Sequence, residues 1–287
     1  MKIKRMLRKK KSHPYRIQFL YRPGKKLGDE AIQILVRELR EVAGTCFETI
    51  PPYQALLGSR EELSDKVITV ARQSDGSMVG FCSTVLLPVP GVGEILHLGL
   101  TCVRPEARGA GLTHLLMKKA VVGYLLRHKP VGRVWVTNCA AVLSSLGNVA
   151  LYFDRVVPCP FGKIQPSEKH VRIARAIGEK YRRKIYIREE AVLDEKRFVF
   201  RGSVRDTVFQ KSASDTRFHH RNGFLNEYYK RLMNFHEGDE VLQVGHVSVL
   251  TALRHGRRKR KLQKRAAEGW SVLPRGLTSD GAENWAA

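Results

Sequence analysis

The stretch from residue 94 to residue 128 constrains the fold more than any other part of the sequence. It begins with EILHLGLTCV (Glu94–Val103), a long and mostly apolar segment that predicts a central strand. Two glycines then stand one residue apart in VRPEARGAGLTHLL (residues 103–116), and apolar residues recur at helical spacing to about His128. A strand that passes into a helix through glycines predicts a sheet with helices packed on it.

The segments on either side continue this alternation of strands and helices. Up to residue 158 the sequence predicts a strand at Tyr15–Arg22, a helix from the N-cap Asp29 to Gly44, a short helix within Pro51–Ser59, a hairpin of strands at Lys66–Gln73 and Met78–Leu87, the strand and helix described above, a strand at Arg133–Asn138 and a helix at Ser144–Asp154. Beyond residue 160 it predicts a helix within 168–183, a short strand at Arg197–Gly202, a helix at Asn222–Phe235 and a closing strand at Glu240–Leu250.

The glycine-rich turn has two interpretations. The first turn of a helix exposes backbone N–H groups, which together with the helix dipole form a site for a phosphate group. Glycines allow a phosphate to approach the backbone closely, and they equally suit a sharp turn that binds nothing. The turn matches neither GxxxxGK[ST] nor GxGxxG, because Leu112, Thr113 and His114 follow Gly111.

The turn and the order of elements around it resemble the GNAT superfamily of N-acyltransferases. That superfamily holds the pyrophosphate of acyl-CoA on a loop of the pattern [QR]-x-x-G-x-[GA], which Arg108 and Gly111 match and from which Thr113 departs. The resemblance covers about residues 15–158. It implies an α/β (α+β) fold with a mixed, mostly antiparallel central sheet flanked by helices, extended here by a C-terminal part.

The resemblance also implies which residues contact an acyl-CoA cosubstrate, expected to be acetyl-CoA. The cosubstrate would lie where the strand Glu94–Val103 separates from the strand Arg133–Asn138. Backbone groups of one strand would pair with the pantetheine amides, and the N–H groups of Gly109 to Thr113 would hold the pyrophosphate. Asn138 either bonds the pantetheine arm or caps the next helix. The expected contact residues are Leu100, Cys102, Val103, Arg108, Gly109, Ala110, Gly111, Leu112, Thr113 and Asn138.

Two residues are candidates for catalysis of amine attack on the thioester. Glu94 lies where many members of the superfamily carry a general base, and it can equally be a solvent-exposed acid at a strand end. Tyr152 lies where the superfamily often has the tyrosine that protonates the leaving thiolate, and it can equally be a core aromatic. His97 is a second candidate base, but alternation puts it on the opposite face from Glu94, and a lone histidine in an apolar strand is more often structural.

The net charge of +24 is partly concentrated at the two ends of the sequence. Residues 1–13 hold seven Lys and Arg and no acid, and residues 254–287 hold nine against three acids. Such tails either attract nucleic acid or another polyanion without reading its sequence, or are disordered and solubilising. Like-charge repulsion disfavours a polycationic acceptor. With no apolar run long enough to span a membrane, we expect a cytoplasmic protein, or a nuclear one in a eukaryote.

We therefore expect four parts: a basic tail (1–13), a GNAT-like core that binds acyl-CoA (14–160), an extension that completes the sheet and the acceptor site (161–253), and a second basic tail (254–287). The predicted function is transfer of an acyl group from CoA to an amine by direct attack, with no metal. The acceptor is a small-molecule or protein amine that the sequence does not identify. The alternative is a GNAT-like binding or regulatory module without catalysis, whose tails contact a polyanion.

Overall fold

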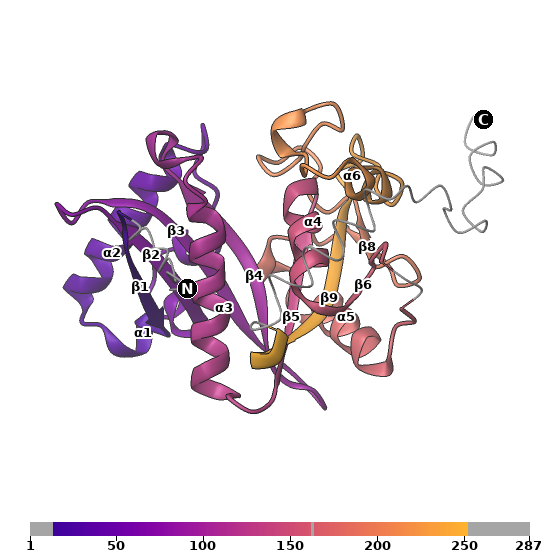
Figure 1. Cartoon of the computed structure of the whole chain (residues 1–287), viewed down its shortest axis with the longest axis horizontal. Helices are drawn as coiled ribbons and strands as arrows, with labels where there is room; N and C mark the ends of the chain where they lie inside the picture. The colour runs from indigo at the N-terminus through magenta and orange to yellow at the C-terminus, as the bar shows by residue number, and fades with distance from the viewer. Residues whose placement is uncertain (1–13, 162–163, 252–287) are drawn as a thin grey trace, which may run out of the picture.

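The computed structural model describes residues 14–161 and 164–251, whose strands form one sheet (Figure 1). The strand order is β1-β2-β3-β4-β5-β9-β8-β7, and β6 pairs with β9. Neighbouring strands are antiparallel except β4 and β5, which are parallel. The strands are β1 (Arg16–Tyr21), β2 (Lys66–Arg72), β3 (Met78–Val89), β4 (Gly93–Val103), β5 (Arg133–Ala140), β6 (Asp154–Val157), β7 (Val192–Asp194), β8 (Val199–Arg201) and β9 (Glu240–Ser248).

Helices cover both faces of this sheet. The helices are α1 (Pro23–Lys26), α2 (Asp29–Gly44), α3 (Leu112–His128), α4 (Leu143–Tyr152), α5 (Glu168–Lys180) and α6 (Gly223–Lys230). α3 and α4 bury apolar residues against one face, together with Leu96 and Val136. α2 and α5 bury theirs against the opposite face, against Phe81 and Val85 respectively. Adjacent strand residues therefore belong to different cores, as the pleat of a strand requires.

This architecture confirms the predicted fold class of a mixed, mostly antiparallel sheet flanked by helices. α3 has the predicted bounds, and so has α2, but the N-cap of α2 is Gly28 and Asp29 is its first helical residue. The short helix predicted within Pro51–Ser59 is present only as a 3-10 helix of three residues, Gln54–Leu56. Gln54 has a φ of 50°, which no α-helix accommodates.

The later elements are shorter than predicted. The strand predicted at Arg197–Gly202 is β8, which has three residues, and the helix predicted to run to Phe235 is α6, which ends at Lys230. The helix predicted to end at Asp154 is α4, which ends at Tyr152, and β6 begins at Asp154. The closing strand is confirmed as β9, which pairs along the whole length of β5.

A bulge in β4 determines how this strand meets its neighbours. The pairing of β4 with β3 shifts by one residue between Leu98 and Thr101, which places the bulge at Gly99 and Leu100. A Cβ on Gly99 would collide with the side-chain amide of Gln54, so a larger residue here would displace that amide. A bulged strand bends, and β4 leaves the plane of β5 here.

The parallel pairing of β4 and β5 is accordingly short. It runs from Leu96 to Leu98 on β4 and from Val136 to Asn138 on β5. Past these residues, β4 has β3 on one edge and, among the described strands, no partner on the other. We call the space between residues 99–103 of β4 and residues 139–140 of β5 the β4–β5 opening. Gly99, Thr101 and Cys139 there are half-exposed although they lie in the middle of the sheet.

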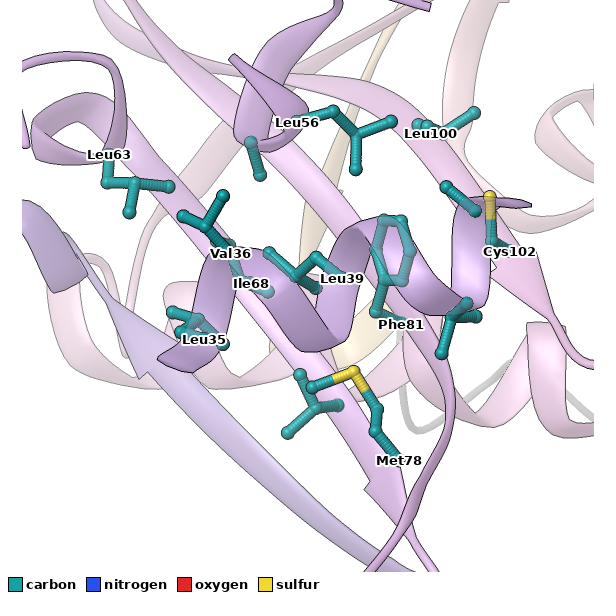
Figure 2. Close-up of a cluster of buried hydrophobic side chains, with 14 of the residues drawn as sticks. Leu35, Val36, Leu39, Leu56, Leu63, Ile68, Met78, Phe81, Leu100 and Cys102 are labelled. Atoms are coloured by element: carbon teal, nitrogen blue, oxygen red, sulfur yellow. The ribbon is translucent and has the colours of Figure 1, made fainter. Parts of the chain in front are cut away.

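α2 holds the part of β4 beyond the bulge. Figure 2 shows its apolar side, with Leu39 at the centre, packed over Phe81, and with Leu100 and Cys102 of β4 beside its C-terminal end. Leu39 and Phe81 are fully buried. The bulge turns Leu100 and Cys102 toward α2, whereas Leu98 before it faces α3. The opening therefore has one packed wall, and its shape does not depend on a loop.

Candidate functional site

The glycine-rich turn is the N-terminus of α3. Gly109 and Gly111 have φ values of 81° and 72°, in the left-handed region that favours glycine. Gly111 is the N-cap, and no side chain caps this end. A Cβ built on either glycine would meet no atom of the described residues within 4 Å, so the space in front of both is open. The turn needs its glycines for backbone conformation, and that conformation leaves the helix end accessible to an anion.

The residues that follow keep this helix end accessible. Leu112 is buried and anchors the first turn of α3 in a core with Val79 and Cys82 of β3, whereas Thr113 and Ala110 are exposed. The side chain of Thr113, which departs from the GNAT pattern, is thus not packed against the protein. The first turn of α3 has no acidic residue, so its dipole is not offset there. These features suit a phosphate group.

Arg108 ties the turn to the end of β4. Its Nε donates to the carbonyl of Val103 at 3.0 Å, and its Nη2 lies 3.6 Å from the Sγ of Cys46. The guanidinium is exposed and faces the same solvent as the two glycines. The glycine-rich turn and the β4–β5 opening are therefore neighbours, joined through Val103.

The predicted contact residues on β4 present their backbone, not their side chains, to the opening. The side chains of Leu100 and Cys102 are buried in the α2 cluster, and that of Val103 is buried against α3. Because β4 lacks a strand partner on this edge among the described residues, its amide and carbonyl groups can pair with an extended ligand as an added strand would. Asn138 is different: it is buried, its Nδ2 donates to Gln243 at 3.1 Å, and its Oδ1 accepts from Ser145 at 3.4 Å.

Tyr152 lies close to the N-terminal end of α3. It is the last residue of α4, and its ring contacts that of His114, with centroids 4.8 Å apart and the ring planes tilted by 41°. His114 is the third residue of α3, so this contact places Tyr152 over the start of the helix. The structure thus brings Tyr152 together with the turn, on the face of the sheet that α3 and α4 cover.

Glu94 lies away from the turn, near the opposite end of β4. It is nine residues before Val103, or about 30 Å along an extended strand. Its carboxylate forms an ion pair with Arg22 and accepts a hydrogen bond of 2.7 Å from the hydroxyl of Tyr124. The predicted alternation is confirmed: Glu94 faces α3, whereas His97 faces the other way and bonds Thr137 at 2.9 Å. Burial lowers the pKa of His97 to about 3, so it is neutral at physiological pH.

Replacement of Glu94 distinguishes its two interpretations. Glu94→Gln is expected to lower the free energy of unfolding by about 1–3 kcal/mol, because Arg22 and Tyr124 lose a charged acceptor. Urea denaturation at pH 7 measures this effect, with Tyr124→Phe as the variant that removes one of the two bonds. A Glu94→Gln protein of unchanged stability that has lost its transferase rate would assign Glu94 to catalysis instead.

A second carboxylate lies at the β4–β5 opening. Glu240 begins β9, beside the end of β5, and is 7% exposed. Its Oε2 accepts a hydrogen bond of 2.6 Å from Ser203 and lies 3.7 Å from the Sγ of Cys139. Cys139 is the first residue of β5 past the paired segment. Burial raises the pKa of Glu240 to about 7, so the carboxylate changes its charge near neutral pH.

Aromatic side chains line the same face near Glu240. Tyr53, Tyr186 and Phe209 meet edge to face, with ring centroids 4.9 to 5.6 Å apart. Gln54, the neighbour of Tyr53, is 2% exposed and donates from Nε2 to the Tyr53 hydroxyl at 2.9 Å, while its buried Oε1 has no hydrogen-bond partner among the described residues. A buried acceptor of this kind can bind an N–H group of a ligand.

The sequence alone did not reveal that Glu240 and Gln54 lie near the β4–β5 opening. Glu240 was predicted as the first residue of a closing strand, and an acid at the start of an otherwise apolar strand was the available signal. Gln54 gave no signal, because its place beside Gly99 depends on a left-handed backbone conformation in the turn before β2. Among residues 14–161 and 164–251, no group of three metal-ligating side chains is placed to hold a metal ion. Within the same ranges, no helix is both long and apolar enough to cross a membrane.

No family model and no curated protein matches the chain. Solved structures do match part of the chain. An acyl-CoA N-acyltransferase from Pseudomonas aeruginosa is 21% identical, over 48% of this chain and 87% of its own, with a TM-score of 0.35. A GNAT-family protein from Desulfovibrio desulfuricans, described as an acetyltransferase, is 19% identical over 44% and 73%, with a TM-score of 0.31. ElaA from Escherichia coli is 16% identical over 54% and 93%, with a TM-score of 0.31. About half of the chain is thus similar to GNAT-family N-acetyltransferases.

Proposed function

We propose that the chain is an acyl-CoA-dependent N-acyltransferase, with acetyl-CoA as its cosubstrate. One observation carries the proposal: an uncapped glycine N-terminus of a helix stands directly beside the edge of a central strand that has no partner among the described residues. The helix end suits a pyrophosphate, and the strand edge suits a chain with two amide groups. CoA carries a pyrophosphate and, a few ångströms further along the molecule, the two amide groups of its pantetheine arm.

In the proposed complex, the N–H groups of Gly109 to Thr113 bind the pyrophosphate, and Arg108 adds a positive charge. The pantetheine arm pairs with the backbone of Leu100 to Val103, and the thioester reaches the bulge at Gly99. Asn138, already bonded to Gln243 and Ser145, holds the end of β5 in place. Thr113 contributes its backbone N–H, since its side chain is exposed and turned to solvent.

The reaction then needs a base for the amine and an acid for the thiolate. The neutral amine attacks the thioester carbonyl, the N–C bond forms, and the C–S bond breaks as the tetrahedral intermediate collapses. Glu240 accepts the proton that the amine loses, and Tyr152 donates a proton to the CoA thiolate. Glu240 is better placed than Glu94 for this role, because it borders the opening on the aromatic face. Tyr152 lies on the other face of the sheet, at the end of α4 and beside His114 of α3.

Calorimetric titration of the full chain tests the proposal. Acetyl-CoA is expected to bind with a Kd of about 1–100 μM, in the usual range for a cosubstrate. CoA should bind comparably, and ADP more weakly, since ADP offers the pyrophosphate without the pantetheine. No heat of binding at millimolar acetyl-CoA would leave the inactive binding module as the better account of the fold.

The two basic tails lie outside the described residues, and their role is a separate proposal. We propose that they contact nucleic acid or another polyanion through charge alone. A chain without residues 1–13 and 254–287 is then expected to lose most of its affinity for DNA or RNA at low salt and to keep its affinity for acetyl-CoA. Unchanged nucleic-acid affinity would remove this idea. The acceptor remains an amine of a small molecule or of a protein.

A further inference from the structure

The side chain of Gln54 lies over the bulge of β4. Gln54 begins the 3-10 helix Gln54–Leu56, whose Leu56 packs against the apolar side of α2 (Figure 2). A Cβ built on Gly99 would stand 2.1 Å from Nε2 of Gln54 and 2.2 Å from its Oε1, so this amide occupies the space that a side chain at residue 99 would take. Leu98 faces α3, and Gly99 with the amide above it therefore faces the opposite side of the sheet.

One oxygen of this amide is buried without a donor. Gln54 is 2% exposed, and its Nε2 donates to the Tyr53 hydroxyl at 2.9 Å. Its Oε1 meets no hydrogen-bond donor within the part of the chain that the structure describes. A buried acceptor that has lost water and gained no donor costs free energy, and so does the φ of 50° at this residue. Both costs are expected where a ligand supplies the missing donor.

Glu240 lies across the β4–β5 opening from this amide. The parallel pairing of the two strands ends just before Gly99 and Cys139, which are therefore the next residues on the two rims of the opening. Oε2 of Glu240 lies 3.7 Å from the Sγ of Cys139, and Cys139 packs on the face of the sheet that α5 covers. The oxygens of Gln54 and Glu240 thus border the same opening from its two rims, on the face away from α3.

We propose that Gln54 binds the acceptor amine and selects a primary amine, an inference that rests on the proposed function. A neutral primary amine carries two N–H groups. One donates to Oε1 of Gln54 and the other to the carboxylate of Glu240, and the nitrogen lone pair is free to attack the thioester. The N–C bond forms, Glu240 takes the proton, the C–S bond breaks, and Tyr152 protonates the CoA thiolate. A secondary amine has one N–H group and leaves Oε1 unpaired.

Aromatic rings near this rim indicate the stem of the amine. Tyr186 and Phe209 meet Tyr53, whose hydroxyl holds the Gln54 amide, with ring centroids 5.6 and 5.5 Å from that of Tyr53. Tyr53 is 7% exposed, whereas Tyr186 and Phe209 are half-exposed and present apolar surface to a ligand. The substrate class is therefore a primary amine on an apolar or aromatic stem, for which phenethylamine is a suitable probe.

A pair of amines tests the role of Gln54. Phenethylamine and N-methylphenethylamine share a stem and differ in their number of N–H groups, and release of the CoA thiol gives kcat/KM for each. Wild type should prefer the primary amine about tenfold or more. Gln54→Met, which has a similar shape and no acceptor, should lose this preference, and Gln54→Glu, which keeps an acceptor oxygen, should retain it. An equal preference in wild type and Gln54→Met overturns the proposal, and so does turnover of neither amine by wild type that binds acetyl-CoA.

The melting temperature distinguishes a ligand-binding amide from a structural one. Because Gln54→Met removes an unpaired buried acceptor, its melting temperature should stay unchanged or rise although the bond to Tyr53 is lost. His246→Phe is the matched control. His246 is 6% exposed, neither of its ring nitrogens has a hydrogen-bond partner among the described residues, and it lies about 20 Å along β9 from Glu240. It should also keep its melting temperature, and it should keep the preference for the primary amine.

Binding of acetyl-CoA separates failure of this proposal from failure of the proposed function. Calorimetry should give the same Kd for wild type and Gln54→Met. Weaker binding by Gln54→Met would assign the amide to the pantetheine arm and overturn its role toward the amine. A clear fall in the melting temperature of Gln54→Met contradicts the role of Gln54 alone, whereas absence of acetyl-CoA binding by wild type contradicts the proposed function.

Discussion

Gly111→Asp is expected to weaken acetyl-CoA binding at least about 100-fold while the protein stays folded. Gly111 has a φ of 72° and stands at the N-cap of α3, with open space where a Cβ would point. A carboxylate there would occupy the position of the pyrophosphate and repel it, at the point where the helix N–H groups and Arg108 otherwise attract it. Titration calorimetry at fixed ionic strength measures the change in Kd.

Gly76→Asp is the matched control for this variant. Gly76 lies in the turn between β2 and β3, has a φ of 89°, and also has open space where its Cβ would stand. Both variants place an aspartate in a left-handed conformation, so each should lose a similar free energy of unfolding, about 1–3 kcal/mol. Only Gly111→Asp should lose acetyl-CoA. If both variants keep their affinity, the glycines of the turn serve backbone conformation alone, and the phosphate interpretation is wrong.

The elements that the sequence predicted well are those with a long apolar pattern and a glycine at one end. α2 carries one apolar stripe and ends at Gly44, and α3 is a mostly apolar run that begins directly after Gly111. β4 could be predicted because an apolar run of that length suits a central strand. β7 and β8 have three residues each, too few for a period to be recognised. β8 pairs with β9, which is distant in sequence, and β7 pairs only with β8 among the described strands.

In the candidate site, too, the local features could be predicted from the sequence and the features that depend on long-range pairing could not. The glycine turn could be predicted because it is local: strand, glycines and helix follow one another in the chain. The bulge at Gly99 could not, because a glycine in a strand does not show whether the pairing slips there. Glu240 comes to the opening only through the pairing of β9 with β5, more than a hundred residues apart. A role assigned from position in the chain, as for Glu94, takes no account of the Arg22 and Tyr124 side chains that bind it.

Glu240→Gln is expected to lower the rate of acetyl transfer about 10²–10⁴-fold without weakening acetyl-CoA binding, because a general base contributes in this range. The wild-type rate should rise with pH through about 7, where Glu240 ionises, and the variant should lack this rise. The release of the CoA thiol measures the rates of wild type and of Glu240→Gln. A panel of primary amines serves as acceptors, with water as the slow competing acceptor. Glu237→Gln, which removes an ion pair with Arg205 in the preceding turn, should keep the wild-type profile.

The same variant has a consequence for stability that does not require a known acceptor. The folded pKa of Glu240, about 7, is above the ordinary value of 4.5 for a glutamate, so the folded state binds more protons than the unfolded state between these pH values. Glu240 therefore stabilises the fold fully only below pH 4.5, and its contribution falls by about 3 kcal/mol as the pH rises past 7. The free energy of unfolding of Glu240→Gln, relative to wild type, should increase by that amount over this window in urea titrations. A difference that stays constant with pH would show that Glu240 is ionised throughout, which would remove the reason to assign it the proton of the amine.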